Sequence, residues 1–212
     1  MDINSVIRNY SAQPITKQIL LSLLKEYKRP YDKINEMVKA SQLILVKRGV
    51  YVSGAAIAEN NKSFFLIANH LYGPSYVSLD TALAYWGLIP EAVLETTSVT
   101  TQTNKKFNTD IGRFNYLYLP LPYYSFGIKQ LEISKTQTSL IANIEKALCD
   151  KIITTKGILL RSAKEATTLM LENYRMDSYL LKSMNTVEMA TWLENAPKKE
   201  SLYWIIKAIN KL

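Results

Sequence analysis

The sequence predicts an α+β protein, because helical and strand-forming patterns occupy separate stretches of the chain instead of alternating along it. Residues 93–133 are rich in β-branched and aromatic residues and are bounded by turn-forming residues, as strands typically are. Apolar residues at the spacing of a helix face dominate before residue 41 and after residue 138. We therefore expect helices at both ends of the chain and, between them, a small and mostly antiparallel sheet.

The distribution of charge divides the chain into two predicted domains. Residues 1–54 carry nine Lys or Arg against four Asp or Glu, whereas the remaining residues carry 17 against 14. A basic module beside a nearly balanced one points to a polyanionic partner for the basic module, although basic surfaces also serve solubility alone. A polar stretch at residues 59–62 marks the boundary, so we predict one domain at 1–54 and another at 63–212.

The first predicted domain begins with three helical stretches. Residues 3–10 form a short helix, and Thr16 caps a firmer helix that continues to Tyr27 with an apolar stripe on one side. The residue before Pro30 is pushed out of the helical region, so this helix ends there. Pro30 then suits the first position of the next helix, which continues to about Ala40.

A β-hairpin completes the first predicted domain. Residues 43–46 and 50–52 read as strands, and the turn between them contains Gly49, which is free to adopt a positive φ. Helix, tight break, helix and hairpin follow in the order of a winged helix-turn-helix, whose second helix enters the major groove of DNA. We predict that six basic residues contact DNA, mostly at phosphates: Lys28, Arg29, Lys33, Lys39, Lys47 and Arg48. The alternative is a helical hairpin with a β-ribbon whose lysines are simply solvated.

The second predicted domain centres on a short strand over residues 76–78 and a helix over residues 79–86, enclosed by proline-containing breaks. Ser78 is expected to cap this helix through its hydroxyl, and Gly87 to close it in a left-handed conformation. The other elements are a helix over 64–71, strands over 93–101, 112–119 and 126–133, a polar turn over 100–108, and a helix from 138 or 139 to about 157. A helical tail from about 160 to 212 follows, in pieces over 162–174, 177–183, 186–195 and 201–211.

Residues that could support catalysis are sparse. His70 is the only histidine and has no nucleophile motif beside it, and one Cys with one His cannot form a usual zinc site. The glycines stand singly at turns, so a glycine-rich phosphate loop is absent from the sequence. Glu145 and Asp150 lie five residues apart and do not share a helix face. We therefore predict that the protein is not an enzyme and binds no metal and no cofactor.

The location of the protein is predicted from the same composition. The single cysteine, Cys149, cannot form an internal disulfide and is expected to pack as a small apolar residue. The beginning of the chain lacks the pattern of a signal peptide, and the longest apolar runs are far too short to cross a bilayer. These features predict a cytoplasmic protein with no membrane partner.

Four short stretches, taken together, resemble a known family. They are residues 42–51 (QLILVKRGVY), residues 76–90 with the sequence YVSLDTAL followed by WGLIP, residues 112–116 (GRFNY) and residues 145–151 (EKALCDK). In this order and spacing they resemble the AbiEi family of antitoxins, which belong to type IV toxin–antitoxin and abortive-infection systems. Ser41 stands where many members of the family have glycine. The resemblance covers residues 15 to 160, and the last fifty residues match only as a helical tail.

The resemblance implies a bifunctional protein of phage defence. Its N-terminal winged domain would bind double-stranded DNA in its own promoter and repress its operon. Its C-terminal domain would counteract a nucleotidyltransferase-like toxin, without a stable complex between the two proteins being implied. For that second activity we predict a polar surface formed by Lys105, Lys106, Lys146 and Lys151. The alternative function is a non-enzymatic protein-interaction module whose winged helix is vestigial.

Overall fold

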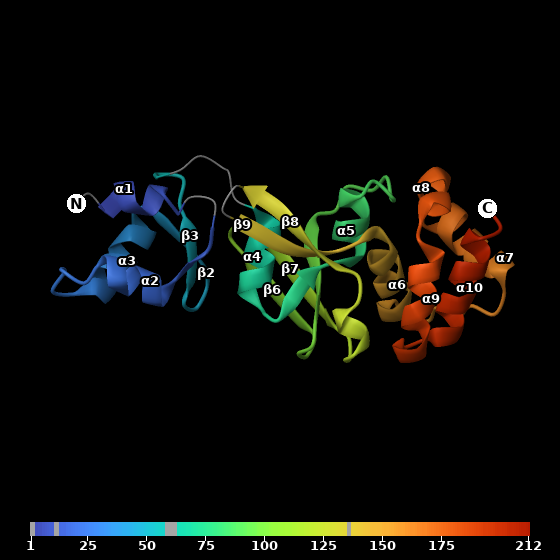
Figure 1. The fold of residues 1–212 in the computed structure, drawn as a ribbon. Coiled ribbons are helices and arrows are strands. Elements are labelled where there is room, and N and C mark those ends of the chain that lie inside the picture. Colours follow the sequence, from blue (N-terminus) through green and yellow to red (C-terminus); the bar gives the residue numbers. More distant parts are fainter. Residues whose placement is uncertain (1–2, 11–12, 58–62, 135–136) are drawn as a thin grey trace.

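The computed structural model describes the chain except residues 1–2, 11–12, 58–62 and 135–136. The predicted linker at residues 59–62 therefore lies outside the described residues. The protein is a mixed α+β fold in which three parts follow one another along an elongated molecule (Figure 1). We name these parts the N-terminal unit (residues 3–57), the sheet unit (residues 63–157) and the C-terminal helices (residues 163–209).

The N-terminal unit combines helices with a three-stranded antiparallel sheet of order β1-β3-β2. Its elements are α1 (Ile3–Arg8), β1 (Ile15–Thr16), α2 (Lys17–Leu23), α3 (Pro30–Lys39), β2 (Leu43–Lys47) and β3 (Val50–Ser53). A small core gathers buried side chains from the helices and the sheet: Ile7, Ile15, Leu20, Leu24, Ile34, Met37, Leu43 and Ile57. The predicted hairpin is confirmed. β1 was not predicted, because a strand of two residues is too short to show a pattern in the sequence.

The two helices that precede the hairpin begin as predicted, but the first ends early. Thr16 caps α2, its hydroxyl oxygen accepting from the amide of Ile19 at 3.3 Å, and Pro30 occupies the first turn of α3. Instead of continuing to Tyr27, α2 ends at Leu23, because the residues between it and Pro30 form the turn to α3. Arg29, with φ −133° and ψ 74°, lies outside the helical region, as expected for a residue that precedes proline.

A close backbone approach joins the start of β2 to the end of β3. Gly54 donates from its amide to the carbonyl oxygen of Gln42 at 2.8 Å, and Ser41 has a φ of 56°. A Cβ atom on Gly54 would lie 2.0 Å from the carbonyl oxygen of Ser41. The backbone fixes the position of the Cβ atom, and the Ser41 oxygen is itself a backbone atom. Only glycine therefore fits at position 54 without moving the hairpin.

Gly54→Ala is therefore expected to destabilise the N-terminal unit by about 1–3 kcal/mol, the usual cost of overpacking. Thermal unfolding followed by circular dichroism would measure the loss. Gly49→Asn is the matched control, because Gly49 has a φ of 86° and open space around it, and asparagine tolerates that conformation. Equal melting temperatures for Gly54→Ala and the wild type would contradict the close approach.

The hairpin belongs to two cores at once. One of its faces contributes Leu43 to the N-terminal core, whereas Val46, Val50 and Val52 are buried in the large core of the sheet unit. Side chains alternate between the two faces of a strand, so a single hairpin can be apolar on both. The hairpin is thus packed between the N-terminal helices and the sheet unit.

The sheet unit contains a six-stranded mixed sheet of order β6-β7-β5-β4-β9-β8. The pairs β5–β7 and β4–β9 are parallel, and the other three are antiparallel. With six strands, the sheet is larger than the small sheet that was predicted. Its strands are β4 (Ser75–Val77), β5 (Glu95–Thr100), β6 (Lys105–Thr109), β7 (Gly112–Tyr118), β8 (Ile128–Ser134) and β9 (Gln137–Ala142). The helices are α4 (Phe64–Leu71), α5 (Leu79–Tyr85) and α6 (Ile144–Thr154), with a 3₁₀ turn at Tyr123–Ser125.

Two strands were not predicted. β6 lies within the stretch interpreted as a polar turn, where Lys105, Lys106 and Asn108 are exposed on an edge strand. β9 occupies the stretch where a helix was expected to begin, and the helix begins only after Asn143. The side chain of Asn143 accepts from the amide of Lys146 at 2.7 Å and so caps α6.

The predicted ends of α5 are right at one end and wrong at the other. Gly87 has a φ of 75° and donates from its amide to the carbonyl oxygen of Ala84. The amide of Leu88 donates to the carbonyl oxygen of Leu83, and these two bonds close the helix as expected. Ser78 makes no side-chain cap. Its hydroxyl donates instead to Asp150 at 2.7 Å, because a buried carboxylate lies within its reach.

The C-terminal helices follow the predicted pattern closely. They are α7 (Ala163–Thr168), which continues as a π-helical segment (Leu169–Asn173), then α8 (Ser178–Ser183), α9 (Thr186–Trp192) with a 3₁₀ turn (Leu193–Asn195), and α10 (Lys199–Ile209). α10 buries Leu202, Ile205 and Ile209 in the same large core as the sheet unit. These helices are therefore not a separate body, but one end of the larger core.

Candidate nucleic-acid interface

A groove separates α3 from the tip of the hairpin, and exposed side chains line both of its walls. α3 presents Tyr31 and Asn35, the hairpin presents Leu45 and Arg48, and the cavity between them has a volume of about 210 Å³. Tyr31 is 53% exposed, so its ring is open to a partner. We name this feature the α3–hairpin groove.

Lys17, the first residue of α2, closes one end of this groove. Its amide donates to the carbonyl of Gly49 at 2.9 Å, which ties the helix to the hairpin tip. Its ammonium lies 4.5 Å from the centroid of the Tyr31 ring. The groove thus combines two cations, Lys17 and Arg48, with an aromatic ring and the amide of Asn35. None of the groove-lining residues is acidic.

A second face of α3 carries charges that neutralise one another. Lys33 donates to Glu36 at 2.8 Å, and Arg29 lies 3.8 Å from Asp32. The hydrogen bond that Lys33 donates to Glu36 raises the pKa of Lys33 above its ordinary value. Two of the predicted DNA-contacting residues, Arg29 and Lys33, are therefore paired with carboxylates before any partner binds.

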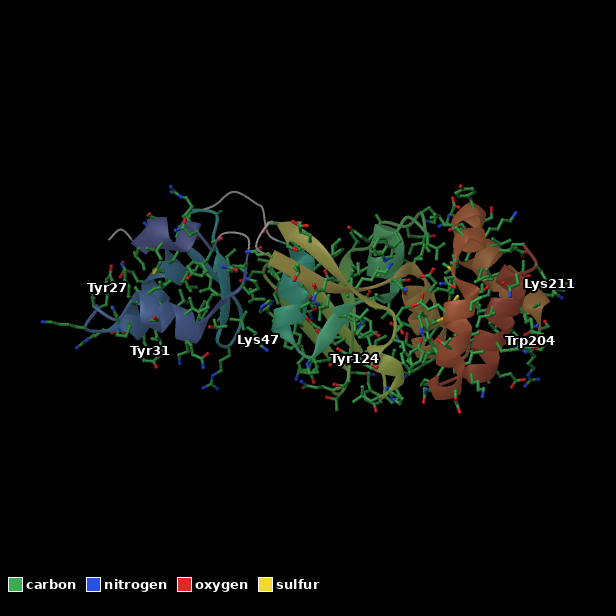
Figure 2. The ribbon with its side chains drawn as sticks, in the orientation of Figure 1. Tyr27, Tyr31, Lys47, Tyr124, Trp204 and Lys211 are labelled. Carbon is green, nitrogen blue, oxygen red and sulfur yellow. The ribbon has the colours of Figure 1, made fainter. Side chains whose placement is uncertain are left out.

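Lys47 is also engaged, but with the sheet unit. Its ammonium donates to the carbonyl oxygen of Leu71, at the end of α4, and lies 5.7 Å from the centroid of the Phe107 ring. Figure 2 shows Lys47 on the side of the N-terminal unit that faces the sheet unit, and Tyr31 farther from it. Of the six predicted residues, Lys28, Lys39 and Arg48 are exposed without a carboxylate partner among the described residues.

Sequence reasoning missed Lys17, Tyr31 and Asn35. The spacing of Tyr31 and Asn35, four residues apart on a helix, was a visible signal that they share a face. Lys17 could not be found in this way, because its place in the groove depends on the pairing of β1 with β3.

The four lysines predicted as one polar surface of the second domain do not lie together. Lys146 is completely buried, and its ammonium lies 2.9 Å from the carboxylate of Asp150, which is also completely buried. Lys105 and Lys106 lie on the edge strand β6, whereas Lys151 is bound to Asp80 at 2.8 Å on α5. The prediction was wrong for Lys146, because α9 and the turn before β8 cover the side of α6 on which it lies.

The buried pair of Lys146 and Asp150 is held by a network of hydroxyl groups. Tyr76, Ser78 and Tyr123 donate to the carboxylate of Asp150 at 3.0, 2.7 and 3.2 Å. Lys146 donates to the carbonyl oxygen of Tyr123 at 2.9 Å and lies 3.3 Å from the centroid of its ring. Every strong partner that two buried charges require is therefore supplied from within the protein.

Burial shifts the pKa values of this network, as expected for groups that stabilise the fold. Burial lowers the pKa of Lys146, and the neighbouring Asp150 opposes that shift. Burial also raises the pKa of Tyr76 and of Tyr123 well above the ordinary value. The pKa of the buried Cys149 thiol is raised for the same reason, so it does not form the thiolate that reactive cysteines require.

A pocket of about 500 Å³ lies between α5, the start of β5 and the segment after the π-helical turn. Its acids are largely occupied, since Asp80 binds Lys151 and Glu91 contacts Arg175. Lys151 also lies 5.2 Å from the centroid of the Tyr174 ring. The described residues contain no group of three or more His, Cys, Asp or Glu placed to hold a metal ion. His70 bonds to the carbonyl of Leu66 in its own helix at 2.9 Å.

Comparisons with known proteins show the fold and leave the function open. No protein-family model matches this chain, and no curated protein matches it. Its fold is similar to the crystal structure of the RV2827C protein from Mycobacterium tuberculosis, with a TM-score of 0.65 and 13% sequence identity. The match covers 98% of this chain and 75% of that chain, so all three parts of the molecule have counterparts there. In the described part of this chain, no helix has the length and apolar character that crossing a membrane requires.

Proposed function

We propose that this protein is a DNA-binding autoregulator and antitoxin: it represses its own promoter and counteracts a nucleotidyltransferase-like toxin. The observation that carries the DNA-binding half is the order of elements in the N-terminal unit. α1, β1, α2, α3, β2 and β3 follow one another, and the strands pair in the order β1-β3-β2. We assign this order to a winged helix-turn-helix, in which α3 would be the helix that enters the major groove and the hairpin would be the wing.

The α3–hairpin groove supports this proposal by its chemistry. Duplex DNA presents phosphates on both sides of the major groove, and a helix that enters it needs cations at its flanks and polar groups at its front. Arg48 and Lys17 supply the flanking cations, whereas Tyr31 and Asn35 supply the front. Lys28 and Lys39, exposed at the two ends of α3, extend the phosphate contacts. The paired face of Arg29, Asp32, Lys33 and Glu36 lies outside this contact.

The antitoxin half is supported by the resemblance of the four sequence stretches to the AbiEi family. Three of them, at residues 76–90, 112–116 and 145–151, contribute β4, α5, β7 and α6 of the sheet unit. Their buried residues, including Tyr76, Ser78, Lys146 and Asp150, form the internal network. We therefore assign these stretches to the fold of the antitoxin domain and place toxin recognition on its exposed surface.

A protein-interaction module with a vestigial winged helix is the second candidate. The observation that favours it is the inward position of Lys47, a basic residue of the wing that is committed to the sheet unit. The two candidates differ in one measurable property, because a vestigial winged helix would not bind the upstream DNA of its own gene.

Binding of the purified protein to a fragment of its own upstream region is expected, and Arg48→Ala should weaken it by about three- to tenfold. The variant should also reduce the slope of log K against log salt by about one, the contribution of one phosphate contact. Lys182→Ala is the matched control, since Lys182 is an exposed lysine on α8 and should leave both quantities unchanged.

The same Arg48→Ala variant separates the two proposed activities in cells. It should lose repression of a reporter under its own promoter but retain protection against the toxin encoded beside it. A wild-type protein that binds its upstream fragment no better than a scrambled fragment would favour the interaction module.

A further inference from the structure

The strand edge nearest the wing carries a surface that the proposed function has not yet used. β6 is the edge strand of the large sheet, and the turn that connects β5 to it contains Thr101, Gln102, Thr103 and Asn104. Together with Tyr118 these residues line an open concave surface of about 750 Å³, which we name the β5–β6 hollow. Tyr118 is 50% exposed there. Figure 1 shows β6 on the part of the sheet unit that lies toward the N-terminal unit.

The cations of the two units meet beside this hollow. Lys47 of the wing lies 5.7 Å from the centroid of the Phe107 ring, and Lys105 of β6 lies 5.9 Å from the same centroid. Among the described residues, neither ammonium has a carboxylate partner. Two ammonium groups beside one ring repel each other, and an anion bound between them would offset that repulsion. Arg48 follows Lys47 in the wing and lines the α3–hairpin groove, so basic side chains continue from β6 to that groove.

The hollow has the composition of a surface for sugar and phosphate. No acidic residue occurs between Glu95 and Asp110, so residues 96–109 present only neutral and basic side chains. Hydroxyl and amide groups are the donors that accompany Lys and Arg at DNA backbones. The side chains of Thr103 and Asn104 are exposed beside Lys105. The Asn104 side-chain oxygen accepts from the amide of Tyr118 at 2.7 Å, which leaves its NH₂ group as a donor, and the Thr103 hydroxyl lies 3.3 Å from that of Tyr72. The 500 Å³ pocket near α5, which contains three carboxylates, lacks this character.

The geometry of β6 distinguishes Lys105 from the lysine beside it. Lys105 pairs in register with Tyr116, and Lys106 pairs with Asn115. Successive side chains of a strand point to opposite faces, so the two lysines lie on opposite faces of the sheet. Tyr116 donates from its hydroxyl to the carbonyl of Ala68 in α4, which places Lys105 on the face toward α4 and the wing. Lys106 faces away from both.

We propose that DNA held by the N-terminal unit continues past the wing and contacts the sheet unit at Lys105, Thr103 and Asn104. This inference rests on the proposed DNA-binding function and deepens it, because it makes the sheet unit part of the operator contact. The wing, fixed on the sheet unit by Val46, Val50 and Val52, gives the two surfaces a constant separation. The duplex that flanks the wing then contributes phosphates to binding, independent of its sequence.

Quantitative binding of the full-length protein to two upstream fragments tests the proposal. The long fragment extends about one helical turn, roughly 10 base pairs, beyond the protected site on both sides, and the short fragment ends at the site. On the long fragment, Lys105→Ala should reduce the salt slope by about one and weaken binding by about three- to tenfold. On the short fragment it should behave as the wild type does.

Two further variants make the result specific. Lys106→Ala is the matched control on the opposite face and should leave slope and affinity unchanged on both fragments. Lys105→Arg keeps the charge and should retain the wild-type slope. Thermal melting of each variant verifies that these exposed substitutions leave the fold intact.

The outcomes separate this inference from the function on which it rests. If Arg48→Ala weakens binding while Lys105→Ala matches the wild type on the long fragment, the DNA-binding function stands and the sheet-unit contact is refuted. Equal losses for Lys105→Ala and Lys106→Ala would also refute it, because they would indicate a diffuse field instead of one face. A wild type that binds neither fragment specifically would remove both the function and this inference.

Discussion

Asp150→Ala is expected to lower the free energy of unfolding by about 3–5 kcal/mol, the largest loss that we predict for a single substitution. The reason is that Lys146 would remain buried without the carboxylate that is its only such partner among the described residues. Three hydroxyl groups, from Tyr76, Ser78 and Tyr123, would lose their common acceptor at the same time. Urea denaturation followed by tryptophan fluorescence would measure the loss.

A neighbouring ion pair, between Lys151 of α6 and Asp80 of α5, supplies the control. Its charged atoms are 2.8 Å apart, but the two side chains are 21% and 38% exposed. Water already solvates such a pair, so Asp80→Ala should cost less than about 1 kcal/mol. If Asp150→Ala costs no more than Asp80→Ala, the buried pair does not stabilise the fold as argued.

The dependence on pH provides a second readout of the same substitution. Burial depresses the pKa of Lys146 in the folded protein, and Asp150 is the main group that opposes the depression. Without Asp150, the folded protein would bind fewer protons than the unfolded chain, whose lysine keeps a pKa near 10.5. Stability of the variant should therefore rise as the pH increases toward that value. A variant whose stability does not change over this range would show that Lys146 leaves its buried position.

The helices and the N-terminal strands were accessible from the sequence because local signals fix them. Thr16 as a cap, Pro30 at a first turn and Gly87 at a helix end each determine a boundary through their own backbone chemistry. The helical tail is amphipathic, and α10 buries one continuous face in the large core. In these stretches the pattern and the tertiary environment agree.

The remaining elements are strands whose own residues do not indicate a strand. β6 is a polar edge strand whose existence is due to its pairing with the neighbouring β7, and its own residues resemble a turn. β9 pairs with the neighbouring β8 and, in parallel, with β4 more than sixty residues earlier, so it lies inside the sheet. The parallel pairing needs no tight turn and leaves no short-range signal of its own.

In the candidate site, too, some features were accessible from the sequence and others depend on tertiary packing. Charge alone placed Lys28, Lys39 and Arg48 on an exposed surface of the N-terminal unit, where the structure has them. Charge alone could not show that Lys47 bonds to α4 or that Lys146 is completely buried, because both depend on tertiary packing. A lysine is rarely found in a core, so the prediction for Lys146 followed the usual behaviour of its residue type.

The second large effect concerns specificity, and it is expected at Asn35. The side chain of Asn35 lies in the α3–hairpin groove, is exposed, and has no hydrogen-bond partner found among the described residues. An asparagine amide matches the two hydrogen-bonding groups of adenine in the major groove, and such a pair discriminates by about 1–3 kcal/mol. Asn35→Ala should therefore reduce preference for the protein's own upstream fragment over a scrambled one by roughly five- to 150-fold.

The salt dependence separates this effect from that of a phosphate contact. Asn35 carries no charge, so Asn35→Ala should leave the salt slope at its wild-type value while the ratio of specific to non-specific affinity falls. Arg48→Ala should do the reverse, lowering the slope and weakening binding to both fragments about equally. Glu36→Gln is the matched control, because Glu36 is exposed on the paired face of α3 beside Lys33 and should not change the ratio. If Asn35→Ala leaves the ratio intact, α3 does not read bases through this residue, and the proposed orientation of α3 in the major groove is wrong.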